Sequence, residues 1–137
     1  MRRISRRLRR AARQTGASAL IVLGSTGGGA MAADEQHFMI DTAADLARLC
    51  ASPSVSPNHD AAIHMCQGYI VGVHHFHEAL AAEMNEGIYC VAGIDPLPSR
   101  DVVMAAFVSW VDANPEMAER EAMDALLTFA AENYPCS

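Results

Sequence analysis

The residues best suited to chemistry are histidines, four of which fall in a short stretch of chain that ends in a glutamate. In a helix, His74 and Glu78 would lie one turn apart and could offer two ligands to zinc or copper. A metal site needs at least one more convergent ligand, and the chain has no second cluster, although His37 or His59 could supply it from elsewhere. We therefore predict no metal ion and no other cofactor. We interpret the histidines as ordinary core or surface residues, with a pH-responsive patch as the alternative.

Four cysteines, Cys50, Cys66, Cys90 and Cys136, include no Cys-x-x-Cys pair and do not have the spacing of a zinc ribbon or finger. In an oxidising compartment they would form two disulfides, for which three connectivities exist. We favour Cys50 with Cys66, across a proline-containing loop, and Cys90 with Cys136, which would tie a loop to the C-terminus. The pairing of Cys50 with Cys136 and of Cys66 with Cys90 stays open.

Motifs of catalysis are missing from the sequence. It has no Gly-x-Ser-x-Gly elbow, no His-Glu-x-x-His helix and no glycine loop placed between a strand and a helix to bind phosphate. Cysteines that form disulfides cannot supply a thiolate nucleophile. We therefore predict that the protein is not an enzyme.

The N-terminal residues have the order of an export signal. Seven arginines in the first thirteen positions precede an apolar run at residues 17–24, and small residues follow, ending at Ala30-Met31-Ala32. The apolar run is shorter than the roughly 20 residues of a membrane-spanning helix. An uncleaved anchor or a basic nucleic-acid arm explains this order less well. We predict that residues 1–32 are a cleaved signal and that the mature protein is periplasmic and not membrane-bound.

Cleavage would change the charge of the protein. Removing residues 1–32 leaves three arginines against all sixteen acidic side chains, a net charge of −13 with neutral histidines. Such a surface repels nucleic acid and anionic membranes and favours a basic partner, or it serves solubility alone.

The remaining chain shows helical periodicity and no alternation long enough for a sheet. The segment at residues 33–41 is short and polar, so we expect it to be a flexible leader. We expect one domain to follow it, at residues 42–137. We predict an all-α, disulfide-tied bundle of about four helices. The expected helices are residues 43–50 capped by Thr42, residues 59–84 capped by Asn58, one starting after Ser99, and one running from Pro115 towards Pro135.

The long second helix has an apolar stripe that predicts one buried face. Its members recur at three- and four-residue spacing: Cys66, Tyr69, Ile70, Val73, Phe76, His77 and Leu80. Gly68 and Gly72 lie one turn apart on the same helix and each costs about 1 kcal/mol against alanine. Close approach of another backbone would compensate for this cost, and a kink is the alternative.

These motifs together resemble the Rap/Tai family of immunity proteins, over residues 42–136. The resemblance rests on the sequence CQGYIVG at residues 66–72, a cysteine ahead of a proline-bearing loop, a helix ending in Asn-Pro-Glu, and an aromatic-Pro-Cys terminus. It covers scaffold positions: Cys50, Cys66, Gly68, Tyr69, Gly72, Cys90, Asn114, Pro115, Pro135 and Cys136. The cluster of His74, His75 and His77 is not part of the family pattern.

The resemblance implies an exported, all-helical protein with intrachain disulfides, often a homodimer. Members protect bacteria from type VI secretion effectors that are periplasmic peptidoglycan amidases, and they obstruct the amidase active site. We predict that the loops at residues 51–58 and 85–99 contact a basic amidase. Glu83, Glu86 and Asp95 would meet the basic rim of the amidase cleft. The alternative function is a periplasmic acid-stress chaperone or a pH-sensing or metal-binding module, because histidines and carboxylates would change the charge in acid.

Overall fold

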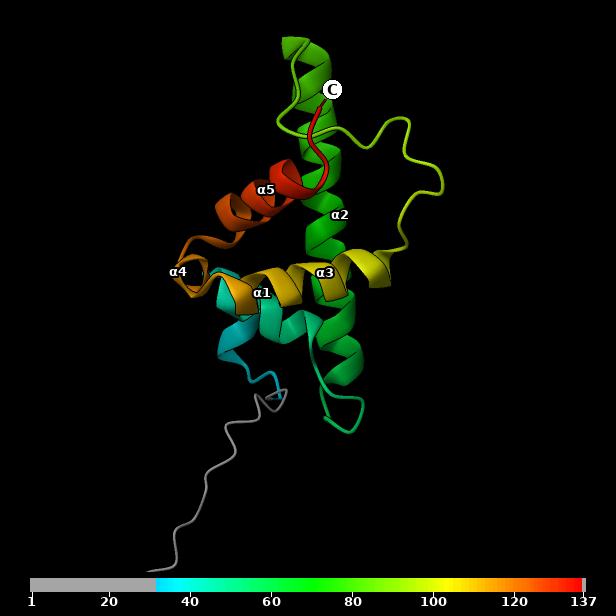
Figure 1. The fold of residues 1–137 in the computed structure, drawn as a ribbon. Coiled ribbons are helices and arrows are strands. Elements are labelled where there is room, and N and C mark those ends of the chain that lie inside the picture. Colours follow the sequence, from blue (N-terminus) through cyan, green and yellow to red (C-terminus); the bar gives the residue numbers. More distant parts are fainter. Residues whose placement is uncertain (1–31, 137) are drawn as a thin grey trace, which may run out of the picture.

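A computed structural model describes residues 32–136, and among these residues it contains helices and no β-strand (Figure 1). The prediction of an all-α, disulfide-tied fold is confirmed. The predicted signal at residues 1–32 lies outside the described residues except for its last position. Within the described part of the chain, no helix combines the length and the apolar character that crossing a membrane requires.

Helix α1 (Ala43–Cys50) begins where the sequence offers a cap. The Thr42 hydroxyl accepts a hydrogen bond from the Asp45 backbone N–H at 3.2 Å, and the Asp45 carboxylate accepts one from the Thr42 N–H at 2.9 Å. This reciprocal pair satisfies two backbone donors that a helix start would leave unpaired.

The two longest helices also match the predicted boundaries. Helix α2 (His59–Met84) runs the full predicted length and ends at Asn85, whose backbone is left-handed with φ 54°. The predicted cap is wrong here, because the Asn58 side chain forms no capping hydrogen bond. Helix α3 (Arg100–Ala113) is capped by the Ser99 hydroxyl, which accepts a hydrogen bond from the Val102 N–H. Because helix caps depend on neighbouring residues only, the sequence locates these ends well.

The predicted fourth helix is two helices, α4 (Pro115–Ala118) and α5 (Ala122–Asn133). Between them the chain lies beside the residues that precede α1. The Arg120 carbonyl accepts a hydrogen bond from the Ala43 N–H at 2.8 Å, and the Ala122 N–H donates to the Asp41 carbonyl at 3.3 Å. Backbone groups that bond across the fold in this way cannot continue a helix, so the expectation of one continuous helix was wrong.

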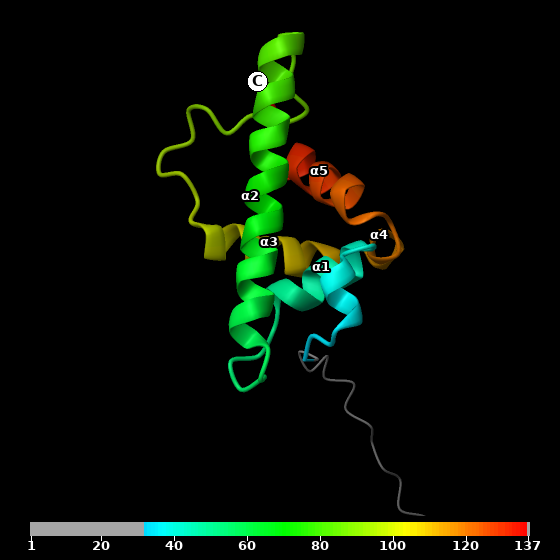
Figure 2. The same cartoon turned by 180° about the vertical axis from the view of Figure 1, so that it is seen from behind.

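The core forms where α1 packs against α2, α3 and α5. Leu46 and Leu49 of α1 are fully buried, as are Phe107 of α3 and Phe129 of α5, whose rings meet edge to face at 5.5 Å. Figures 1 and 2 show α2 on one side of the layer formed by α1, α3 and α5, so that its outer side is uncovered.

Residues 33–41 differ from the expected flexible leader. They contain a short 3₁₀-helix, η1 (Gln36–Met39), and the side chains of Ala33 and Ile40 are 4% and 8% exposed in the core. The two apolar residues are difficult to recognise in a short, mostly polar segment. They pack in the core with α1, so the segment is part of the bundle.

The predicted buried face of α2 is correct only in part. Cys66, Val73 and His77 are buried, whereas Phe76 and Leu80 are exposed. The C-terminal end of α2 extends beyond α5 (Figure 1). Leu80 lies on the same face by helical spacing, yet it is 44% exposed. Helical periodicity identifies a face and does not show how far along the helix the partner reaches.

The two glycines of α2 do not meet another backbone. Gly68 and Gly72 are exposed, and no atom of the described residues would lie within 4 Å of a Cβ added at either position, other than atoms of the helix itself. The expected close approach within the chain was therefore wrong.

Both disulfides have the favoured connectivity. Cys50 bonds to Cys66 and joins α1 to α2, and Cys90 bonds to Cys136 and joins the chain after α2 to the C-terminus. No free cysteine is present among the described residues. The disulfides fit an exported protein.

Candidate partner-binding site

The C-terminal end of α2 and the chain that follows it are largely exposed. We name residues 80–86 the α2 tip, residues 87–91 the return segment and residues 92–99 the projecting loop. Large apolar side chains are exposed in all three: Met84 is 69%, Ile88 58% and Leu97 64% exposed. Exposed large apolar side chains near one helix end, here Met84 and Ile88, are typical of surfaces that bind a partner.

Two of the predicted acidic contact residues lie together on this surface. Glu83 is in the last turn of α2 and Glu86 follows directly after it, both exposed. Asp95 is exposed in the projecting loop, which extends away from α2 (Figures 1 and 2). Among the described residues none of the three carboxylates forms an ion pair. All three are therefore free to meet a basic partner.

The two loops predicted for contact lie at opposite ends of α2. Residues 51–58 precede its first turn and residues 85–99 follow its last, and 26 residues separate them. At 1.5 Å per residue the helix is about 39 Å long. The two loops therefore do not form one continuous surface, and the exposed apolar and acidic side chains favour the second.

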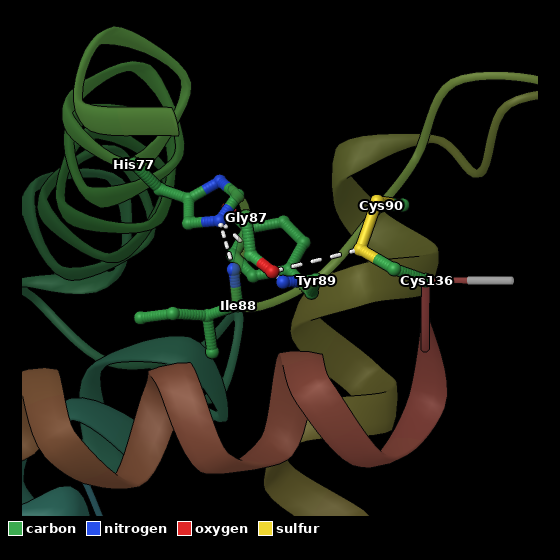
Figure 3. Close-up of a disulfide and its surroundings, with 6 residues drawn as sticks. All are labelled: His77, Gly87, Ile88, Tyr89, Cys90 and Cys136. Atoms are coloured by element: carbon green, nitrogen blue, oxygen red, sulfur yellow. Dashed lines mark hydrogen bonds between the residues drawn. A yellow bond between two sulfur atoms is a disulfide. The ribbon is translucent and has the colours of Figure 1, made fainter. Parts of the chain in front are cut away.

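The return segment is fixed at both ends (Figure 3). At its far end Cys90 is bonded to Cys136, and the Cys90 N–H donates to the Tyr134 carbonyl at 2.8 Å. At its near end the Nε2 atom of His77 accepts hydrogen bonds from the N–H groups of Ile88 at 3.0 Å and Tyr89 at 3.4 Å. The segment thus runs back along α2 instead of leaving it.

His74 contacts the same segment from one turn earlier in α2. Its Nδ1 atom lies 3.0 Å from the Tyr89 hydroxyl, and its Nε2 atom lies 3.5 Å from the Glu78 carboxylate. His75 is exposed and forms no hydrogen bond with the return segment. Two of the three clustered histidines therefore contact the return segment or its neighbours.

The metal candidates His74 and Glu78 gain no third ligand in this part of the protein. The Nδ1 atom of His37 lies 2.8 Å from Asp34 in the N-terminal segment, and that of His59 lies 2.9 Å from the Ser52 carbonyl at the other end of α2. Within residues 32–136 no three histidine, cysteine or acidic side chains are arranged to hold a metal ion.

Burial shifts the titration of two groups at the return segment. Burial lowers the pKa of His77 below its ordinary value, and the neighbouring His74 lowers it further, while Glu78 acts in the opposite direction. Burial, with a smaller effect of Glu78, raises the pKa of Tyr89 to about 12. Both groups therefore stay neutral near pH 7.

A cavity of about 310 Å³ lies beside this region. Its walls are mostly apolar side chains of α2, α3 and α5, and the return segment and the projecting loop close one side. Leu97 and Val91 belong to this wall. The projecting loop therefore rests on an incompletely filled apolar space rather than on a packed core.

The sequence did not identify the contacts of Ile88 and Tyr89 with the histidines. They join residues eleven and twelve positions apart through a reversal of the chain. The available signals were Asn85, which tolerates the left-handed backbone, and Gly87, which lets the chain pass close to α2.

The model of the Rap1a immunity proteins matches residues 42–136, from the cap of α1 to the second disulfide. The chain belongs to this family. No curated protein and no solved structure matches it. As a Rap1a immunity protein, the chain belongs to a class whose members bind a cognate effector and are generally not enzymes. The match includes all four cysteines and the α2 tip.

Proposed function

We propose that this Rap1a-family protein acts in the periplasm, where it binds a peptidoglycan amidase delivered by a type VI secretion system and obstructs its active site. The family match supports the immunity role. Two disulfides support an oxidising compartment, because cytosolic thiols are kept reduced. Export would require the signal predicted at residues 1–32.

The α2 tip and its neighbours are the main support for the proposed contact surface. Met84 and Ile88 offer exposed apolar area, and Glu83 and Glu86 are exposed next to them in the sequence without an ion pair. An apolar centre with a charged rim is the usual composition of a protein interface. Acidic groups at the rim would steer a basic amidase towards this surface.

The protein would act by occupying a cleft, without catalysis of its own and without a cofactor. An obstructing surface must be rigid, because ordering a flexible loop on binding costs affinity. The Cys90–Cys136 disulfide and the His77 hydrogen bonds hold the return segment in place before any partner arrives.

We further propose that two copies associate through the outer side of α2. Met65, Gly68, Gly72 and Phe76 are exposed on α2 at helical spacing, and Figure 2 shows that one side of α2 is not covered by another helix. Small residues allow two helix backbones to approach closely, which would explain glycines that meet nothing within the chain. A dimer would present two α2 tips.

Co-expression tests the immunity role. A candidate amidase effector is directed to the periplasm of a host cell, with and without this protein, and growth is followed. We expect lysis without the protein and normal growth with it. A catalytically dead form of the amidase is the control and should be harmless with and without the protein. Lysis that proceeds despite periplasmic accumulation of the protein would contradict the proposal for that amidase.

The family match favours immunity over the acid-stress chaperone considered from the sequence. The two functions differ in a direct measurement. A chaperone would suppress the aggregation of an unrelated client at about pH 4, where histidines are protonated and about half of ordinary carboxylates are. We expect no such suppression.

A further inference from the structure

The attachment of the return segment to α2 depends on two histidines. Within the described residues, every hydrogen bond between α2 and residues 87–91 involves His77 or His74. We infer that His77 positions the α2 tip and the return segment for partner binding, and that it releases them in acid. This inference rests on the proposed function for the identity of the binding surface, although the release can be observed without a partner.

The geometry fixes the state in which His77 holds the segment. Its Nε2 atom accepts from two backbone N–H groups, so the ring must be neutral and its proton must lie on Nδ1. The ring also stacks on Tyr89 with centroids 3.9 Å apart and planes 16° from parallel. Figure 3 shows the imidazole facing the backbone of the segment that it holds.

Gly87 makes this approach possible. A Cβ at this position would lie 3.4 Å from the Nε2 and Cε1 atoms of His77 and 3.2 Å from the Tyr89 carbonyl oxygen. A side chain would therefore press on both the ring and the backbone that the ring binds. The absence of a side chain lets the segment lie against the imidazole.

A protonated His77 could not make the same contacts. Both nitrogens of an imidazolium donate, so Nε2 would face two N–H donors instead of accepting from them. Nδ1 is buried and has no hydrogen-bond partner among the described residues, so its N–H gains no acceptor in exchange. Burial of an unpaired charge is costly, and the contact must open to admit the proton.

The groups around His77 determine the pH at which its imidazole is protonated. His74 and Glu78 face it from α2, and Tyr89 and Glu86 lie around the same hollow from the chain that follows. Burial and His74 lower the pKa of His77, and Glu78 opposes them. Because the folded pKa lies below the unfolded value of 6.5, the contact is fully stabilising above about pH 6.5. Its contribution declines as the pH falls from there to the lowered pKa.

The far end of the return segment does not respond in the same way. The Cys90–Cys136 disulfide does not titrate, so it still ties the segment to the C-terminus when His77 is protonated. Release is therefore local to residues 85–89, which follow the last turn of α2. The helices of the bundle remain folded.

Amide hydrogen exchange of the exported protein at about pH 7.5 and about pH 5 tests this inference, with rates corrected for the intrinsic effect of pH. We expect protection of the Ile88 and Tyr89 amides to fall at least tenfold at the lower pH, while core amides of α1 keep theirs. The unmodified protein suffices for this measurement. Equal protection of the two amides at both pH values would overturn the inference.

Two variants of His77 distinguish the effect of its Nε2 hydrogen bonds from the effect of its stacked ring. His77→Gln retains an acceptor that does not titrate, so protection should no longer depend on pH. His77→Phe retains stacking without an acceptor, so protection should be low at both pH values. His75→Gln is the matched control, because His75 is exposed and forms no hydrogen bond with the segment, and it should behave as the unmodified protein. If His77→Gln keeps the original pH dependence, the inference is wrong.

Affinity for the amidase, measured with the same proteins, tests whether this position matters for binding. We expect binding to weaken about tenfold at pH 5 in the unmodified protein and to be insensitive to pH in His77→Gln. Exchange that responds to His77 without a change in affinity would overturn the role in binding. Absence of any binding at pH 7.5 would instead contradict the proposed function and would leave the exchange result unaffected.

Discussion

At the N-terminus of α1, Thr42 forms hydrogen bonds through its hydroxyl and its backbone with Asp45. We expect Thr42→Ala to lower the free energy of unfolding by about 1 kcal/mol, the usual cost of losing such a cap. Thr42→Ser keeps the hydroxyl and should lose much less. Denaturant unfolding followed by circular dichroism measures both. Equal losses in the two variants would show that the methyl group, rather than the cap, is what stabilises this position.

Tyr89 should ionise far above the ordinary value for tyrosine, because burial raises its pKa to about 12. Its folded pKa is the higher one, so the folded state holds a proton that the unfolded state releases above about pH 10. The stability of the protein should therefore decrease between about pH 10 and 12. Ultraviolet titration of the phenolate and thermal unfolding measure the two effects.

Tyr89→Phe provides the control for this titration. The variant keeps the ring that stacks on His77 and removes the ionisable hydroxyl, together with its contact to His74. It should lose the highest phenolate transition and part of the decline in stability. A highest transition that persists in Tyr89→Phe would assign it to another tyrosine.

The helices themselves were largely predictable because their ends depend on local residues. Thr42 with Asp45, Ser99 and Asn85 each act within one turn, and the boundaries of α1, α2 and α3 follow from them. The break between α4 and α5 was not predictable, because it depends on bonds from Arg120 to Ala43 and from Ala122 to Asp41, about 80 positions away. Local signals do not report such pairing.

The candidate site was predictable only in composition. Glu83 and Glu86 were identified by charge and position, but the exposure of Leu80 depends on where α5 stops beside α2 (Figure 1). His77 falls in the buried stripe from its spacing alone. Its hydrogen bonds to the return segment need the reversal after Met84, and no residue pattern specifies its path.

The outer side of α2 gives a prediction for the element as a whole. Gly72→Leu should raise the stability of the single chain by up to about 1 kcal/mol, since leucine favours a helix and space around this position is open. The same change should block close helix packing and abolish dimers. Analytical ultracentrifugation measures the association and thermal unfolding measures the stability.

Ala82→Leu is a suitable control, since Ala82 is exposed on α2 away from the glycines. It adds the same side chain outside the proposed contact and should leave association unchanged. If Gly72→Leu associates as the unmodified protein does, the proposed dimer contact is wrong.

Across the whole molecule, acidic groups far outnumber basic ones. Only three arginines, Arg48, Arg100 and Arg120, lie in residues 33–137, against all sixteen acidic side chains, and Arg120 pairs with Asp124. The negative charge of the surface therefore does not by itself identify where a basic partner binds. At the α2 tip and the segment after it, acids combine with exposed large apolar side chains, and this combination makes the tip the proposed contact.

Charge reversal at the tip tests this account most directly. The affinity of a cognate amidase is measured by calorimetry at about pH 7.5 for the unmodified protein, for Glu83→Lys with Glu86→Lys, and for Asp112→Lys with Glu119→Lys. The last pair makes the same charge change at exposed positions at the ends of α3 and α4, away from the tip. We predict at least tenfold weaker binding, about 1.4 kcal/mol, for the tip variant and a change within about twofold for the control. Equal affinities of the two variants would contradict the assignment of the α2 tip as the binding surface.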